Sequence, residues 1–226
     1  MTVGTTTFTG IGSFEHVAAA AAAECKQKHS GSRSNFVAYA AWEIDEVARQ
    51  MIAAHPIASK PLHLFGSVMK RLHENDLVTL KGIEEEILST WDAVKQDHAM
   101  GNVTSSMMKE WESSLRESLV DRLSSSLEGM EFRDTAECSF CDKQCPISPR
   151  STPDFAEAYW VEAAGSPCPS HSAAGRGTRY LDDTALLALV WMFPQGSTKP
   201  IQYFTRIQIV IRKTGWPTSL RKREQR

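Results

Sequence analysis

Two glycines and one glutamate in the first 45 residues have the types and the order of a nucleotide-binding site. Gly10 and Gly12 follow a β-branched and aromatic stretch, Thr5–Thr9, and precede a helix-prone one. Glycine after a first strand lets the backbone pass close to a ligand, where a side chain would collide. Glu43 ends a second apolar stretch, and a carboxylate there accepts hydrogen bonds from ribose hydroxyls. The pattern predicts a site for an adenosine-containing cofactor. A generic α/β domain, in which Glu43 caps or pairs at the surface, is the alternative.

Cys168, in the loop Gly165–Cys168 (GSPC), is a candidate for nucleophilic chemistry. A thiolate is populated near neutral pH and leaves readily after it has added to an electrophile. The loop lies between a predicted strand and a predicted helix, where α/β sheets collect their active sites. A single cysteine is more often a small buried apolar residue than a nucleophile, so this interpretation depends on the neighbouring motifs. A thiol hydrolase that pairs Cys168 with His171 is disfavoured, because residues three apart on a tight loop rarely form a nucleophile–base pair and no orienting acid is evident.

Three more cysteines have the spacing of a partial zinc site. Cys138 and Cys141 form a C-x-x-C pair that can hold half of a tetrahedral metal, and Cys145 can supply a third ligand. A fourth ligand has to come from His171, His98 or another distant residue. Because there is no second C-x-x-C pair, the sequence favours ordinary loop cysteines modestly over zinc, and no metal is predicted.

The elements that must position these residues alternate between strands and helices at the start of the chain. Strands are predicted over Thr5–Thr9, Phe36–Trp42 and Leu62–Phe65, with helices that begin at Ser13 and after Asp45. Strands and helices in this order predict a parallel sheet built from βαβ units.

A charged, helix-prone stretch, 69–130, then interrupts the alternation. Apolar residues recur every three or four positions on both sides of Gly101 and Asn102, which predicts an inserted helical hairpin. A Cys- and Pro-rich loop, 138–153, closes the insertion. The remaining predicted elements are a buried strand over Phe155–Ala164, a helix from Asp182 to about Met192 and a strand over Ile201–Ile211.

Two sets of motifs resemble those of the cytosine-5 DNA methyltransferases. The segment Phe8–Glu15 (FTGIGSFE), with Trp42–Asp45 (WEID) and Ala48, is similar to the first two motifs of that family. The segment Gly165–Ser172 (GSPCPSHS), followed by Ala174–Gly177 (AGRG), is similar to its catalytic loop. The resemblance covers roughly residues 5–68 and 155–193.

The resemblance implies an α/β fold with a Rossmann-like S-adenosylmethionine-dependent methyltransferase sheet, incomplete and carrying an inserted α-helical hairpin. It implies methyl transfer from S-adenosylmethionine to cytosine in DNA, with Cys168 as the catalytic nucleophile on a base flipped out of the stack. The residues assigned to the cofactor are Phe8, Gly10 and Gly12 (methionine part), Glu43 (ribose), Ile44 and Ser67 (adenine), and Pro167. The residues assigned to DNA are Ser170, Ser172 and Arg176, for which a solvated loop is the plainer explanation.

Several departures from the family pattern bear on activity. Ser67 replaces the aspartate that receives the adenine amino group, and serine is a weaker acceptor there. Lys199–Ile207 stands about where the family has Glu-Asn-Val, and it has no carboxylate. General-acid help of that kind is typically worth about 100- to 10,000-fold. The arginine-rich motif, the target-recognition domain and the closing motif have no counterpart before Arg226. We therefore expect a truncated or divergent member with poor or absent activity. The alternative is a non-catalytic methyltransferase-like module that binds cofactor, or a protein partner through the helical insertion.

Composition and charge bound these interpretations. The 226 residues, 42% hydrophobic and 23% charged, are typical of a globular protein. The net charge of −2 argues neither for nor against DNA as a partner. No signal peptide is evident, and Val17–Ala23 is too short an apolar run for a bilayer, so an intracellular location without membrane contact is expected, nuclear if the source is eukaryotic. The expected parts are a cofactor-binding part (1–68), a helical and Cys-rich insertion (69–154), a catalytic-loop part (155–211) and a basic tail (212–226).

Overall fold

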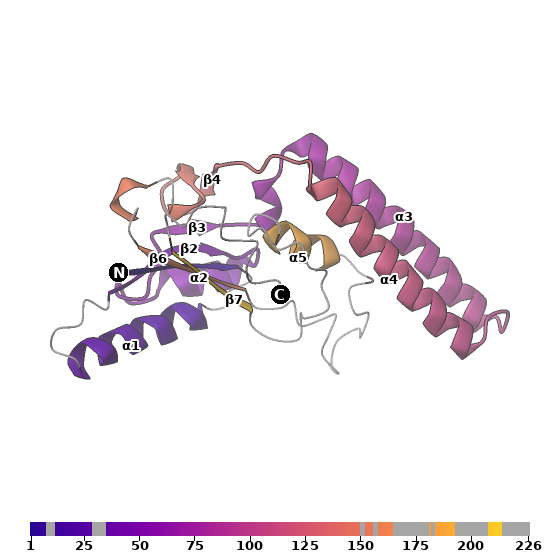
Figure 1. Cartoon of the computed structure of the whole chain (residues 1–226), viewed down its shortest axis with the longest axis horizontal. Coiled ribbons are helices and arrows are strands. Elements are labelled where there is room, and N and C mark those ends of the chain that lie inside the picture. The colour runs from indigo at the N-terminus through magenta and orange to yellow at the C-terminus, as the bar shows by residue number, and fades with distance from the viewer. Residues whose placement is uncertain are drawn as a thin grey trace, which may run out of the picture. The chain divides into compact units, whose positions relative to one another are not determined.

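The computed structural model describes residues 1–7, 12–28, 35–149, 152–155, 158–164, 181, 184–192 and 208–213 (Figure 1). The chain divides into two compact units. The first is Met1–Ser67 with Asp134–Gly165 and Ile207–Arg226, and the second is Val68–Arg133 with Ser166–Arg206. The α/β class expected from the sequence is confirmed. The expected parts 69–154 and 155–211 have other limits than these units, because Asp134–Gly165 belongs to the first unit and Ser166–Arg206 to the second.

The first unit is built on a seven-stranded mixed sheet with the order β5-β4-β3-β2-β1-β6-β7. The strands are β1 (Thr2–Thr7), β2 (Phe36–Trp42), β3 (His63–Phe65), β4 (Thr135–Cys138), β5 (Lys143–Pro146), β6 (Tyr159–Ala164) and β7 (Gln208–Lys213). β1, β2, β3 and β6 are parallel, which confirms the parallel pairing expected for the first three strands. β4, β5 and β7 are antiparallel to the strands that they adjoin.

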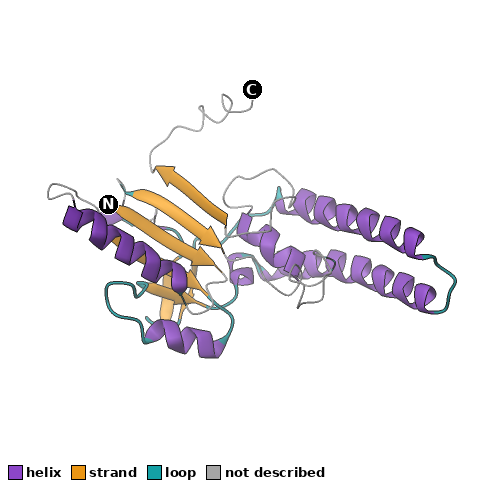
Figure 2. Ribbon diagram, turned by 90° about the horizontal axis from the view of Figure 1, so that it is seen from below, coloured by secondary structure: helices purple, strands orange, loops and turns teal. Residues whose placement is uncertain are grey.

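The central strand β2 shows why this region forms a sheet interior. Its sequence FVAYAAW has no polar alternation, and Ala40, Ala41 and Trp42 are fully buried. A continuous apolar run of this kind is typical of a strand covered on both faces. The two helices that link the first three strands are α1 (Ser13–Lys28) and α2 (Glu46–Ala53). Figure 2 shows α1 running alongside the strands, with its axis in roughly the same direction as theirs. The predicted N-cap Asp45 is confirmed, since its carboxylate accepts the Ala48 N–H.

A hairpin replaces part of the loop that the sequence predicts over 138–153. β4 and β5 pair antiparallel, and alternate residues of β4, Ala136 and Cys138, are buried. The turn between them places Asp142 at φ 51°, a left-handed conformation that aspartate adopts more readily than most residues. Sequence reasoning missed this hairpin because its strands are four residues long and, apart from Thr135, lack the β-branched and aromatic residues that mark strands.

The second unit contains the helical hairpin expected from the sequence. Its elements are the 3₁₀ turn η1 (Val68–Arg71) and the helices α3 (Glu74–Ala99), α4 (Ser105–Leu127) and α5 (Thr184–Met192). Both expected apolar stripes contribute to the contact between α3 and α4, with Ile87, Trp91, Leu119 and Leu123 buried. Thr104 caps α4 by accepting the Met107 N–H at 3.3 Å. The apolar helix α5 packs on α3, α4 and η1. Among the helices of the described segments, none combines the length and the apolar character that a membrane span requires.

Candidate functional site

The three segments that carry the predicted motifs begin directly after β1, β2 and β6, at the carboxyl ends of these strands. Thr7, the last residue of β1, pairs with Trp42 of β2 on one side and with Ala164 of β6 on the other. All three strands are parallel, so their carboxyl ends lie together. The chain moves from β1 to β2 and β3 in one direction and later adds β6 on the opposite side of β1. Open α/β sheets bind ligands at such a switch point, outside the carboxyl ends of the strands.

Glu43, directly after β2, is held in place by backbone hydrogen bonds. Its N–H donates to the Phe65 carbonyl at 3.0 Å, and its Oε1 accepts the Asp45 N–H at 2.9 Å. Only 9% of the residue is exposed. The carboxylate thus stabilises the turn into α2, as the structural alternative for Glu43 supposes. An ionised carboxylate accepts several hydrogen bonds, so this role and ribose binding are compatible.

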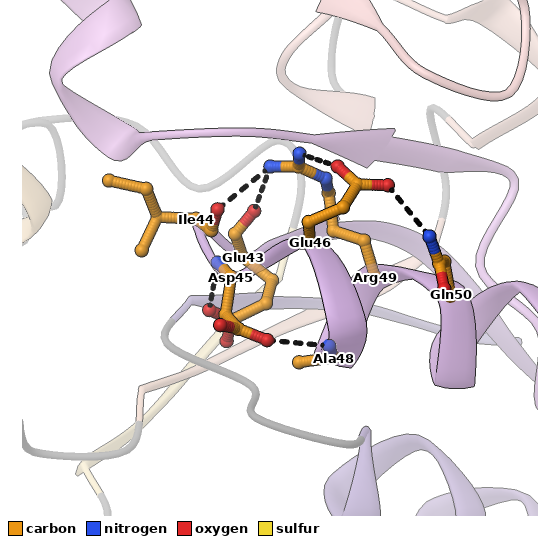
Figure 3. Close-up of polar contacts among 7 residues, drawn as sticks. All are labelled: Glu43, Ile44, Asp45, Glu46, Ala48, Arg49 and Gln50. Atoms are coloured by element: carbon orange, nitrogen blue, oxygen red, sulfur yellow. Dashed lines mark hydrogen bonds and ion pairs between the residues drawn. The ribbon is translucent and has the colours of Figure 1, made fainter.

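Arg49 stabilises the same turn from the other side (Figure 3). Its Nη1 donates to the carbonyls of Glu43 and Ile44, at 3.1 and 3.0 Å, and its Nη2 pairs with Glu46. This pairing lowers the pKa of Glu46. Figure 3 shows the Ile44 side chain pointing away from these polar groups, and the residue is 69% exposed. An exposed apolar side chain beside a buried carboxylate suits the flat face of a base. Sequence reasoning missed Arg49. The signal that could have found it is its i, i+3 spacing from Glu46, which favours an ion pair on a helix.

Glu15, in the first turn of α1, is a buried acid that sequence reasoning did not assign. The residue is 1% exposed, and its Oε1 accepts a hydrogen bond from the Thr6 hydroxyl. Burial raises the pKa of Glu15, against the opposing effect of that hydrogen bond. Its Oε2 is buried and has no hydrogen-bond partner among the described residues, as is also true of the Thr7 hydroxyl. A buried carboxylate oxygen with remaining capacity beside the glycine segment suits a ligand cation or N–H donor.

Gly12 requires glycine for reasons within the protein. Its φ is 77°, and a Cβ at this position would lie 2.5 Å from the His55 Cε1 atom. The His55 ring in turn packs against His16, with 4.0 Å between ring centroids. The close approach at Gly12 is therefore to a side chain of α2's following loop, and contact with a cofactor stays a prediction.

The other predicted site residues divide into one that the structure describes and a larger set that it does not. Ser67 is half-buried, two residues after the end of β3, which places it at the carboxyl edge of the sheet. The predicted residues that lie outside the described segments are Phe8, Gly10, Pro167, Cys168, Ser170, Ser172 and Arg176.

A second cluster lies at the β3–β4–β5 edge of the sheet. His63, Cys138, Cys141 and Cys145 each offer a ligand atom, and these four atoms lie within 4.8 Å of one another. The sequence predicts ordinary loop cysteines here, with His98 or His171 among the candidates for a fourth ligand. His98 instead contacts the Val103 carbonyl through Nδ1 at 2.7 Å, and His171 is not among the described residues.

Two titrating groups of this cluster are shifted from their ordinary pKa values. Burial, together with the neighbouring Cys138 and Cys145 thiols, raises the pKa of Cys141 to about 11. Burial, followed by the charge of Lys143, lowers the pKa of His63. Sequence reasoning missed His63 because it lies 75 residues before Cys138, and nothing in the local pattern indicates that β3 pairs with β4.

Comparisons of the chain with models of protein families, with curated proteins and with solved structures found no match.

Proposed function

We propose that the carboxyl edge of β1 and β2 binds S-adenosylmethionine and that the protein is a cytosine-5 DNA methyltransferase-like enzyme with Cys168 as its nucleophile. The sheet is then of the Rossmann-like methyltransferase type. The observation that carries the proposal is the register of β1, in which Thr7 pairs with both Trp42 and Ala164. That register brings together the starts of the three segments whose sequences resemble the family's motifs, although they are far apart in the chain.

The residues at this edge fit the parts of the cofactor. Glu43 accepts hydrogen bonds from the ribose hydroxyls, and Ile44 covers one face of the adenine. The buried carboxylate of Glu15 offers an acceptor for the ammonium group of the methionine part. Ser67 is a weaker acceptor for the adenine amino group than the aspartate it replaces, because its hydroxyl is uncharged. When bound, S-adenosylmethionine supplies a methyl group made electrophilic by its sulfonium.

Cys168 makes the target base reactive. Carbon 5 of cytosine is a poor nucleophile, and addition of the Cys168 thiolate to carbon 6 forms a C–S bond that turns carbon 5 into an enamine carbon. Loss of the carbon 5 proton to a base and departure of the thiolate later restore the ring. The base must leave the DNA stack for the thiolate to reach it.

Turnover by this chain is expected to be slow. A general acid that protonates the ring nitrogen during thiolate addition is typically worth about 100- to 10,000-fold, and Lys199–Ile207 contains no carboxylate to supply it. The next strand, β7, pairs antiparallel with β6. The sheet is therefore not extended there by a further βαβ unit, which would add a parallel strand.

Covalent trapping tests the proposal. DNA containing 5-fluorocytosine cannot lose the carbon 5 substituent as a proton, so an enzyme that has transferred a methyl group stays attached through its cysteine. With S-adenosylmethionine, the unmodified chain is expected to give an adduct that survives a denaturing gel. Cys168→Ser is expected to give none, while Cys25→Ser, which alters an exposed cysteine on α1, retains it. An adduct in the Cys168→Ser variant contradicts the assignment.

A non-catalytic module is the second candidate, and two observations favour it. One is the missing carboxylate described above. The other is the exposure of three large apolar residues at the end of α3 and in the first two turns of α4, namely Met100, Met107 and Trp111. Exposed large apolar side chains close together in the chain favour a protein-binding role for this region. Cofactor binding without adduct formation or methyl transfer supports this module. Methyl transfer to DNA by this chain excludes it.

A further inference from the structure

The β3–β4–β5 edge carries a set of side chains that the proposed methyl transfer does not use. We propose that His63, Cys138, Cys141 and Cys145 form a zinc site that holds the β4–β5 hairpin on the sheet. The inference is independent of the methyltransferase proposal, because it depends only on these four side chains and on the strands that carry them.

The distances match tetrahedral coordination. His63 Nδ1 lies 3.8 Å from the Cys138 sulfur and 3.7 Å from the Cys141 sulfur. Zinc bonds of about 2.3 Å to sulfur and about 2.0–2.1 Å to nitrogen at tetrahedral angles separate two ligand atoms by roughly 3.6 Å. All four ligand atoms already lie within 4.8 Å of one another, so a small contraction completes the geometry. Three thiols and one imidazole are a common ligand set of structural zinc.

The hairpin brings its three sulfurs together through its own pairing. Cys145 pairs with Ala136 across the ladder, and Cys138 is two residues further along the same strand, so both lie on one face. Cys138 and Cys145 are buried, at 0% and 2% exposure. The tight turn, closed by the Asp142 N–H to the Cys138 carbonyl at 2.9 Å, returns Cys141 to the same side. This turn with a C-x-x-C pair is the usual geometry of half a zinc site.

Contacts around the turn keep it against the sheet. The Ser139 N–H donates to the Leu64 carbonyl at 2.8 Å. Phe140 packs on the core cluster of Ala41, Ile52 and Leu64, and the Lys60 ammonium lies 4.7 Å from the Phe140 ring centroid. These contacts fix the turn beside β3, which carries His63, so the fourth ligand is presented by a rigid neighbouring strand.

The need for a cross-link follows from how little backbone pairing joins the hairpin to the sheet. β3 is three residues long, and Phe65 with Cys138 is the one Cα pair in register between β3 and β4 among the described residues. A short two-stranded hairpin is marginal in water. A metal that binds one ligand from β3 and three from the hairpin ties the two together. Because all four positions are filled by protein, the site is structural and leaves no position for a substrate.

A disulfide is the competing use of these cysteines. Cys138, Cys141 and Cys145 are all free thiols in the structure. A Cys138–Cys141 bond would leave the Cys145 thiol and the His63 ring in the same buried cluster without a shared partner. A single ion accounts for all four side chains together.

Metal analysis of the full chain tests the site. The untagged protein is purified under reducing conditions without added metal, and its metal content is measured by mass spectrometry of the elements. One zinc per chain is expected. Single variants Cys138→Ser, Cys141→Ser, Cys145→Ser and His63→Ala are expected to lose it, while Cys25→Ser retains it. Absence of zinc in the unmodified protein, or stoichiometric iron in its place, overturns the proposal.

Two further measurements guard against variants that fail to fold. His63→Cys supplies a sulfur in place of the imidazole nitrogen, and zinc retained at one per chain supports His63 as a ligand position. Cobalt exchanged into the unmodified protein is expected to give the intense visible bands of a tetrahedral thiolate site. Octahedral cobalt spectra, or zinc retained in full by His63→Ala with unchanged affinity in competition with a chelator, overturn the assigned ligand set.

Discussion

The sheet carries two sites, and the sequence reveals one of them more fully than the other. At the carboxyl edge of β1, β2 and β6, motifs follow one another in the sequence in a recognisable order. At the β3–β4–β5 edge, four ligands come from two distant segments, and the sequence shows three of them without their partner. Short motifs reveal a site built from loops after successive strands. A site closed by strand pairing becomes visible only when the pairing is known.

Of the predicted effects, removal of the metal from the β3–β4–β5 site is expected to be the largest. Zinc present at about 1,000 times its dissociation constant stabilises the folded state by about 4 kcal/mol. For a chain of this size, that corresponds to a fall of roughly 8–16 °C in the unfolding midpoint when the metal is removed. Thermal unfolding before and after dialysis against a chelator measures it, with Cys138→Ser as the matched metal-free protein. A chelator effect of equal size in Cys138→Ser would show that the stabilisation does not come from this site.

Substitution of Gly12 tests the structural role of the glycine segment. Gly12→Ala forces a side chain into the left-handed region and against His55, and such backbone strain typically costs on the order of 1–3 kcal/mol. Chemical denaturation measures the loss. Gly82→Ala, in α3 with open space around it, is the matched control and is expected to be stabilising by about 0.5–1 kcal/mol. If His55→Ala in the Gly12→Ala background recovers none of the loss, the contact with His55 does not contribute to it.

The buried acid Glu15 gives a smaller effect that depends on pH. Burial raises the pKa of Glu15, so the folded state keeps a proton that the unfolded state releases. The stability that this proton confers is complete below pH 4.5, the ordinary value, and is lost as pH rises through the raised pKa of the folded protein. Glu15→Gln keeps an acceptor for the Thr6 hydroxyl and removes the titration. The variant's advantage in unfolding free energy over the unmodified protein should therefore grow with pH and then level off.

The control for this series is Glu24→Gln, which alters an exposed glutamate on the same helix that pairs with Lys28. Because the Glu24 carboxylate is exposed, its removal takes no charge out of the interior. We expect no comparable rise with pH in the difference in unfolding free energy between this variant and the unmodified protein. A constant difference between Glu15→Gln and the unmodified protein from pH 4 to pH 8 would contradict a raised pKa at Glu15.

Much of the fold follows from local patterns. The apolar run of β2 predicts a buried strand with the same limits as observed, Phe36–Trp42. Asp45 predicts the start of α2, and the break at Gly101 predicts the turn between α3 and α4. Each of these features depends on residues within about ten positions, which is the range over which propensity and capping act.

The features that sequence reasoning missed depend on tertiary contacts and strand pairing that the local pattern of residue types does not show. β4 has weak strand propensity, and it forms by pairing along its length with β5 and at Cys138 with Phe65 of β3. His63 becomes a ligand candidate through that same pairing. Glu15 reads as an ordinary acid near a helix start, and its burial arises from packing against Thr6 of β1. The local sequence does not encode these partners, so its pattern cannot predict them.

Titration calorimetry with S-adenosylmethionine tests the central proposal most directly. We expect one cofactor per chain, displaced by S-adenosylhomocysteine. Glu43→Ala removes the carboxylate that accepts the ribose hydroxyls, and loss of a charged hydrogen bond of this kind is expected to weaken binding by about 10- to 100-fold. Glu24→Ala is expected to bind as the unmodified chain does. No detectable binding, or equal affinity in the Glu43→Ala variant, would contradict a cofactor site at the carboxyl edge of β1 and β2.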